Sequence, residues 1–162
     1  FEHAMKSGAG YAEIILADGL AVGAYMAVNA CGEIYDQDKI LAGALADDDR
    51  TIISSHRLML EGYERNMGGN TSIGCIITNA DLTKTECRMV STMAHDGLAR
   101  SIRPVHTSMD GDTLFTMASG EVKTTIDTVG YLAEEAVRLA VLDAAASAEG
   151  MGGRPAYRDI IK

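Results

Sequence analysis

Basic residues are scarce in this sequence. Its 162 residues hold 14 lysines and arginines against 23 aspartates and glutamates, which gives a formal net charge of −9. Nucleic-acid binding needs clustered basic side chains that neutralise phosphates. We therefore expect no nucleic-acid partner, and the acidic surplus is typical of a soluble protein.

The sequence also lacks a long apolar run. A membrane-spanning helix needs roughly 18 uninterrupted apolar residues, whereas Asp18, Asn29 and Glu33 interrupt the richest stretch. We expect no membrane span. A hydrophobic content of 47% is nevertheless enough for a sizeable core in a single domain made of residues 1–162.

Cysteines and histidines are few and scattered. The three cysteines lie in apolar runs: Cys31, Cys75 and Cys87. Neither they nor the four histidines have the spacing of metal ligands: His3, His56, His95 and His106. Small thiols in such runs are usually buried and reduced. The pattern predicts a cytoplasmic protein that needs no metal and no other cofactor.

The first half of the sequence predicts a hairpin followed by a connecting region. Two β-rich runs, residues 11–16 and 20–31, meet at Asp18-Gly19, a dipeptide that accepts the positive φ angles of a tight turn. Residues 32–69 are more acidic and less regular, so we interpret them as a connector with a short amphipathic helix at residues 56–65.

The middle of the sequence predicts a strand and a helix. Residues 72–79 are apolar at successive positions, which is typical of a strand covered on both faces. Thr83 and Glu86 have the spacing of a capping box, so we expect a helix of about four turns to begin there and to end by Pro104.

A further strand and helix follow. Residues 112–119 predict a strand, and apolar residues at helical spacing from Ile126 onwards predict a long helix that ends in the glycines of "EGMGG". Residues 157–162 are expected to add a short final element. This order favours layered sheets covered by helices, an α/β fold rather than a simple sandwich.

Thr71 stands at the mouth of the predicted strand, directly after Gly68, Gly69 and Asn70. An isolated threonine hydroxyl is a weak nucleophile. It gains a base when it is the first residue of a chain, because its own α-amine, with a reference pKa of about 7.7–8.0, can accept the proton. This hypothesis requires cleavage of the Asn70–Thr71 bond.

The glycines before Thr71 allow the chain to cut itself, because they let the hydroxyl swing toward the Asn70 carbonyl and attack it. Two other interpretations remain open. Gly-Gly-Asn is a common turn before a strand. Asn70-Thr71-Ser72 also matches a glycosylation sequon, although it lacks a secretory context and adjoins a buried strand. Spacing alone does not separate these alternatives.

Three other polar residues are candidates for the same site. Asp110 and Asp112 are two positions apart on an extended segment, which predicts carboxylates on one face that orient an amine and shuttle its proton. Asn29 ends an apolar strand, where its amide can donate to an oxyanion. Each residue alone also fits an ordinary turn. Neither His95, next to Asp96, nor His106 receives a role.

Three segments together carry a resemblance to a known family: "VNACGEIYD", "GGNTSIGCIITNADLTK" and "MAHDGLARSIRPVHTSMDGDTLFTMASG". They resemble the DmpA-like family of self-processing aminopeptidases and nylon-oligomer (6-aminohexanoate oligomer) hydrolases. The likeness runs from about Met5 to the C-terminal helix. It implies a four-layer α-β-β-α sandwich similar to the N-terminal-nucleophile hydrolases.

The resemblance also implies the roles of individual residues. Thr71 matches the nucleophile, Asn29 the oxyanion-stabilising asparagine, and Asp110 and Asp112 the pair beside the amine. Threonine with Asp-Gly-Asp resembles the nylon-oligomer branch, whereas the aminopeptidases usually have serine with Ser-Gly-Glu. Cleavage would divide the chain into residues 1–70, the end of an α chain, and residues 71–162, the β chain, and αβ units would assemble into homotetramers.

Family members carry a longer N-terminal portion with a lysine and a tyrosine that help to build the site. Lys6 does not match that lysine, and the sequence begins at Phe1, so we expect a larger precursor. The function expected is an autoprocessed N-terminal threonine hydrolase of small peptides or linear oligoamides. The alternatives are an unprocessed binding or assembly subunit and a self-cleaving acyltransferase of the ornithine acetyltransferase type.

Overall fold

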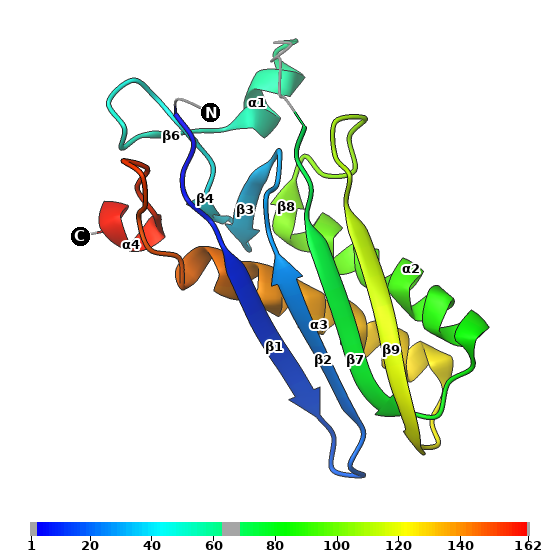
Figure 1. Ribbon diagram of the computed structural model, residues 1–162. Helices are drawn as coiled ribbons and strands as arrows, with labels where there is room; N and C mark the ends of the chain where they lie inside the picture. Colours follow the sequence, from blue (N-terminus) through cyan, green and yellow to red (C-terminus); the bar gives the residue numbers. More distant parts are fainter. Residues whose placement is uncertain (1–2, 63–68, 162) are drawn as a thin grey trace.

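The computed structural model describes residues 3–62 and 69–161 (Figure 1). Its main sheet has the strand order β1-β2-β7-β9, with β1 at Ala9–Ile15, β2 at Ala21–Ala27, β7 at Ile73–Ala80 and β9 at Thr113–Val122. The two long helices, α2 (Lys84–Ser101) and α3 (Ile126–Ala146), lie side by side across one face of this sheet. Within the described part of the chain, no helix is long and apolar enough to cross a membrane.

The predicted hairpin is confirmed. Strands β1 and β2 pair antiparallel, and the turn between them includes Gly19 at φ 88°, a left-handed angle that glycine adopts without strain. The second strand is shorter than predicted, because it ends at Ala27 rather than continuing to Cys31. The residues that follow leave the sheet and contribute to the candidate site described below.

The strand–helix–strand unit in the middle of the chain is also confirmed. Thr83 accepts a hydrogen bond from the Glu86 backbone N–H, and the Glu86 side chain accepts one from the Thr83 N–H, so the predicted capping box starts α2. This helix ends at Ser101, before Pro104. It connects β7 to β9, which pair parallel, as a crossover connection must.

The connector is more structured than the sequence indicated. Residues 32–69 contribute the short strands β3 (Glu33–Asp36), β4 (Lys39–Ala42), β5 (Ala44–Leu45) and β6 (Ile52–Ile53), and helix α1 (Ser55–Leu60). Strands β4, β3 and β8 (Ile102–Arg103) form one small sheet, and β5 and β6 form another. The helix predicted at 56–65 is observed from Ser55 to Leu60, and positions 63–65 lie outside the described residues.

The C-terminal elements match their predictions in kind but not in length. Helix α3 ends at Ala146, before the glycines that were expected to terminate it, and Ser147 occupies its C-cap. The short final element is helix α4, Tyr157–Ile160. This helix begins directly after Ala156, whose N–H donates to Asp159 Oδ2 at 2.9 Å.

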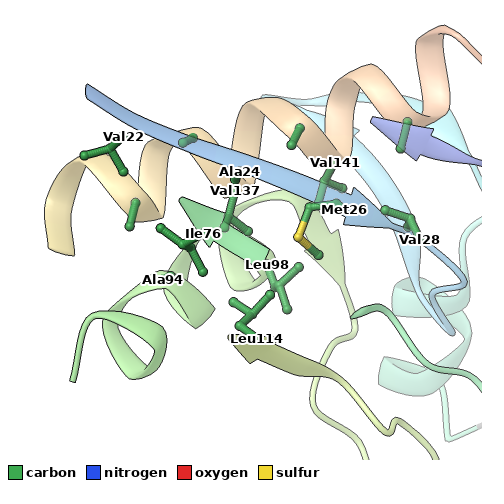
Figure 2. Close-up of a cluster of buried hydrophobic side chains, with 14 of the residues drawn as sticks. Val22, Ala24, Met26, Val28, Ile76, Ala94, Leu98, Leu114, Val137 and Val141 are labelled. Atoms are coloured by element: carbon green, nitrogen blue, oxygen red, sulfur yellow. The ribbon is translucent and has the colours of Figure 1, made fainter. Parts of the chain in front are cut away.

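The hydrophobic core lies between the main sheet and the two long helices (Figure 2). Its buried side chains come from both strands and helices and include Val22, Ala24, Met26, Ile76, Leu98, Leu114, Val137 and Val141. Alternation along a strand sends these residues inward and their neighbours outward. On β7, for example, Gly74, Ile76 and Thr78 are buried.

The outward face of the sheet is apolar and exposed in this chain. Its large side chains are 48–59% exposed: Tyr11, Tyr25, Ile73, Ile77, Phe115 and Met117. The sequence predicted that β7 is covered on both faces. Within the described residues the helices cover one face, while Ile73 and Ile77 on the other remain about half exposed.

Strand β1 approaches α3 so closely that one position requires glycine. A Cβ added to Gly10 would overlap the Ala140 carbonyl oxygen and the Ala144 amide nitrogen, both of them backbone atoms of α3. Two positions earlier in the chain, a Cβ on Gly8 would meet only the Ala144 oxygen at 3.7 Å, an ordinary contact. These two glycines therefore form a matched pair.

We predict that Gly10→Ala lowers the free energy of unfolding by about 1–3 kcal/mol, because the helix must move away from the sheet. Gly8→Ala is expected to leave it unchanged or to raise it slightly, since alanine restricts the unfolded chain. Urea unfolding of both variants measures the difference. Equal midpoints for Gly10→Ala and the unmodified protein would contradict the close packing described here.

Candidate functional site

Thr71 lies two residues before the start of β7, beside the segment that leads into β9. Backbone pairing joins the two segments: Asn70 and Asp110 form a parallel bridge, and the Thr113 N–H donates to the Ser72 carbonyl at 3.0 Å. Because β7 and β9 run parallel, their starting ends lie at the same edge of the sheet (Figure 1). The predicted nucleophile and the predicted acidic pair are therefore neighbours.

The Asn70–Thr71 peptide bond is held by hydrogen bonds on both of its sides. Thr71 Oγ1 donates to the Asn70 carbonyl oxygen at 2.7 Å, and the Gly111 N–H donates to the same oxygen at 2.9 Å. The Thr71 N–H donates to the Asn29 carbonyl at 3.0 Å, and the Asn70 N–H donates to the Met109 carbonyl at 3.2 Å. This peptide group has little freedom to reorient.

Glycine at position 111 makes room for the threonine hydroxyl. A Cβ added to Gly111 would lie 2.7 Å from Thr71 Oγ1, closer than real side-chain contacts allow. In the predicted hinge, Gly69 is exposed and has no atom within 4 Å of an added Cβ. Gly68, the other residue assigned to that hinge, lies outside the described residues.

The two aspartates have different partners. Asp112 Oδ1 accepts the Ser72 N–H at 2.9 Å, and the Asp112 side chain is only 4% exposed. Asp110 Oδ2 accepts hydrogen bonds from the Thr107 N–H at 2.9 Å and from Thr107 Oγ1 at 2.7 Å. Asp112 therefore fixes the chain just after Thr71, whereas Asp110 closes the loop that carries the Gly111 donor.

Asn29 is next to Thr71, as predicted, but the observed hydrogen bond between them comes from its backbone. The Asn29 carbonyl accepts the Thr71 N–H, and the residue as a whole is exposed. A role for its side-chain amide toward an oxyanion stays a prediction. Strand β2 ends at Ala27, two residues before Asn29.

The residues after Asn29 pack tightly against other segments of the chain. A Cβ on Gly32 would overlap the backbone of Arg103 and Pro104, so only glycine fits there. Glu33 is fully buried, and its carboxylate accepts the Ser55 N–H at 2.7 Å and the His56 N–H at 3.3 Å. This charge–dipole contact anchors the start of α1, the helix that leads toward the Asn70–Thr71 bond along the chain.

Cys31 is a neighbour that the sequence analysis missed. Burial raises the pKa of the Cys31 thiol above its ordinary value, while hydrogen bonds with Asn70 and Thr107 oppose that rise and the nearby Asp110 charge adds to it. The thiol is therefore predominantly protonated at neutral pH. Its proximity to Asn70 depends on long-range folding, so no local sequence signal identifies it.

His106 is a second missed neighbour. Its Nδ1 lies 3.3 Å from Asp112 Oδ2, and its ring centroid lies 5.0 Å from that of His95 on α2. Burial, followed by the proximity of His106, lowers the pKa of His95. Among the described residues, no group of three or more His, Cys, Asp or Glu side chains could hold a metal ion.

Comparison with known proteins places this geometry in a family. The model of peptidase family S58 matches residues 1–158, and the chain belongs to that family. An uncharacterised aminopeptidase of Mycobacterium leprae is 34% identical over 94% of this chain and 48% of its own length. A 6-aminohexanoate-oligomer endohydrolase of Kocuria sp. is 41% identical over 33% of this chain and 15% of its own length.

Solved structures show the same fold. A Burkholderia sp. β-aminopeptidase superposes with a TM-score of 0.66 at 19% identity, covering 97% of this chain and 48% of that chain. An L-aminopeptidase D-Ala-esterase/amidase of Ochrobactrum anthropi, described as a variant of the N-terminal-nucleophile hydrolase fold, superposes with a TM-score of 0.60 at 18% identity, covering 94% and 44%. The expected fold class is confirmed, and this chain spans about half the length of such relatives.

We predict that Asp112→Ala increases hydrogen exchange at the Ser72 amide. The substitution leaves this N–H without its buried acceptor, which costs about 1–3 kcal/mol and corresponds to exchange about 5- to 150-fold faster. The measurement is made in a Thr71→Ala background, so that the Asn70–Thr71 bond stays intact. Asp110→Ala serves as the control because Asp110 binds Thr107 instead, and equal acceleration by both variants would refute the assignment.

Proposed function

We propose that this chain is part of an autoprocessed N-terminal threonine hydrolase that cleaves amide bonds in small peptides or linear oligoamides. One observation carries the proposal: Thr71 Oγ1 lies 2.7 Å from the Asn70 carbonyl oxygen, and the Gly111 N–H donates to that same oxygen at 2.9 Å. A hydroxyl and a second hydrogen-bond donor lie beside a single peptide group, so the nucleophile and the oxyanion donor that acyl transfer to the hydroxyl needs are both close to the Asn70 carbonyl.

Self-cleavage begins with attack of Thr71 Oγ1 on the Asn70 carbonyl carbon. The carbonyl oxygen becomes an oxyanion, which the Gly111 N–H stabilises. The carbon–nitrogen bond then breaks, the Thr71 nitrogen leaves as an amine after taking up the hydroxyl proton, and an ester joins Asn70 to Thr71. Water hydrolyses the ester to the Asn70 carboxylate and the free Thr71 hydroxyl.

The same hydroxyl then acts on a substrate amide. The free α-amine of Thr71 takes the hydroxyl proton, and the Asn29 carbonyl, which holds the Thr71 nitrogen at 3.0 Å in the uncut chain, orients that amine. Asp112 fixes the following residue through the Ser72 N–H, and Asp110 maintains the loop that carries Gly111. In this proposal the Asn29 amide stabilises the substrate oxyanion, and water releases the acyl group. No metal or cofactor takes part in these steps.

The substrate class is proposed from the relatives. Membership of a peptidase family supports an amide hydrolase. Thr71 together with Asp-Gly-Asp at residues 110–112 resembles the nylon-oligomer branch of that family. The relative named a 6-aminohexanoate-oligomer endohydrolase supports linear oligoamides as substrates. After cleavage, residues 1–70 and 71–162 would remain associated as parts of an αβ unit, and we propose that such units form homotetramers.

Self-cleavage is tested by purifying the full-length protein and sequencing its N-termini. We expect two polypeptides under denaturing conditions, one of them beginning Thr-Ser-Ile-Gly. Thr71→Ala should give a single uncut polypeptide without amide hydrolysis, because the nucleophile is gone, whereas Thr71→Ser keeps a hydroxyl and should still cut. A folded wild-type protein that stays uncut and inert would favour the unprocessed binding or assembly subunit instead.

Substrate turnover gives a separate test. We expect hydrolysis of linear 6-aminohexanoate oligomers, with kcat/KM rising with pH through about 7.7–8.0, because the α-amine must lose its proton to act as the base. Mass spectrometry of the products and a pH–rate profile measure both features. Transfer of the acyl group to ornithine in preference to water would identify the acyltransferase alternative.

A further inference from the structure

His106 is positioned as a functional residue, although the proposed chemistry leaves it unused. Its Nδ1 lies 3.3 Å from Asp112 Oδ2, and the other oxygen of that carboxylate holds the Ser72 N–H at 2.9 Å. The chain of contacts therefore runs from His106 through Asp112 to the residue directly after Thr71. The Asp112 side chain is 4% exposed, and the His106 side chain is 40% exposed.

The backbone at His106 adopts an uncommon conformation. Its φ of 55° lies in the left-handed region, which costs free energy for most residues and is tolerated best by glycine and, among the others, by asparagine, aspartate and histidine. Such conformations persist where the surrounding structure holds them, and they are frequent at functional sites. At this position the conformation is accompanied by an imidazole that faces the Asp112 carboxylate.

We propose that His106 is a positioning residue for self-cleavage and turnover at Thr71. In this proposal a hydrogen bond from His106 Nδ1 to Asp112 Oδ2, made across the observed 3.3 Å contact, holds the carboxylate in the orientation in which Oδ1 binds the Ser72 N–H. The inference rests on the proposed function, because it assigns a second supporting residue to the same nucleophile. The contact between His106 and Asp112 is observed in the structure and does not depend on that function.

A carboxylate with one fixed oxygen can still rotate, and a second donor removes that freedom. Asp112 has no hydrogen to offer when ionised, so the proposed hydrogen bond requires His106 to carry its proton on Nδ1. The ring of His95 also contacts the His106 ring, and the pKa of His95 is lowered by burial and then by His106, which keeps His95 neutral beside the pair. Among the described residues, the ionisable groups around this contact are Asp112, His95 and, beyond His95, Asp96.

Two substitutions separate the donor from the backbone conformation. His106→Gly tolerates the positive φ but removes the ring, whereas His106→Asn tolerates it and supplies an amide donor close to the place of Nδ1. We expect His106→Gly to slow both cleavage at Asn70–Thr71 and amide hydrolysis by about 3- to 30-fold, a loss that is limited by the exposure of the ring. His106→Asn should restore most of the rate.

The matched control is another histidine–aspartate pair of the same chain. His3 Nδ1 lies 3.4 Å from Asp49 Oδ1, a contact that involves none of the residues around Thr71. His3→Asn should therefore leave both rates at the wild-type level. Urea unfolding of all three variants shows whether a lower rate reflects loss of folded protein, and rates are compared per folded molecule.

A second readout does not depend on cleavage. In the uncut Thr71→Ala protein, nitrogen NMR of the imidazole should show His106 protonated on Nδ1, since the hydrogen bond that a ring makes selects its tautomer. Adding Asp112→Ala should shift the proton toward Nε2. Replacing Asp110 in the same way should leave the His106 signal unchanged.

The outcomes separate this inference from the proposed function. Slow cleavage in His106→Gly with recovery in His106→Asn supports the positioning role. Equal rates in His106→Gly and wild type, or equal slowing in both variants, overturn it while self-cleavage itself stands. If the wild-type protein is never cut, the proposed function fails. Independently, if the Nδ1–H signal of His106 is the same with and without Asp112→Ala, the proposed hydrogen bond between His106 and Asp112 is refuted.

Discussion

The parallel pairing of β7 with β9 is the constraint on which the site depends. Parallel neighbours begin at the same edge of a sheet, so the residues that precede them in the chain must meet there. Thr71 precedes one strand and Asp112 precedes the other, and the register that joins Ile73 to Thr113 brings the Gly111 N–H to the Asn70 carbonyl. Helix α2, started by its capping box, is the crossover that makes this pairing possible.

The parts of this arrangement with a local cause were predictable from the sequence. Thr83 and Glu86 cap each other three residues apart, and Asp18-Gly19 turns the hairpin by itself, so both signals are complete within a few residues. Thr71, Asp110 and Asp112 were found because each stands beside an apolar strand run and because the three segments resemble a known family. Their roles in chemistry remain predictions, whereas their proximity is a property of the structure.

Most of the missed features depend on contacts between distant segments. Cys31 meets Asn70 only through the tertiary fold, whereas His106 meets Asp112 within one loop, and the small β4-β3-β8 sheet was mistaken for an irregular connector because its strands are short. The pattern in β7 likewise predicted cover on both faces, yet apolar residues show only that a face avoids water. They do not tell which part of a protein provides the cover.

The sheet order has a mechanical consequence for a break in the backbone at residue 70. Strand β2 precedes that bond in the chain and β7 follows it, yet the two strands pair over six positions, from Val22↔Thr78 to Ala27↔Ile73. Helix α3, which follows the bond, also packs on β1 and β2, which precede it. Breaking the Asn70–Thr71 bond would therefore remove none of the paired positions between β2 and β7. Such a break would free a chain end at residue 71, while the strand pairing and the helix packing would continue to join the two parts.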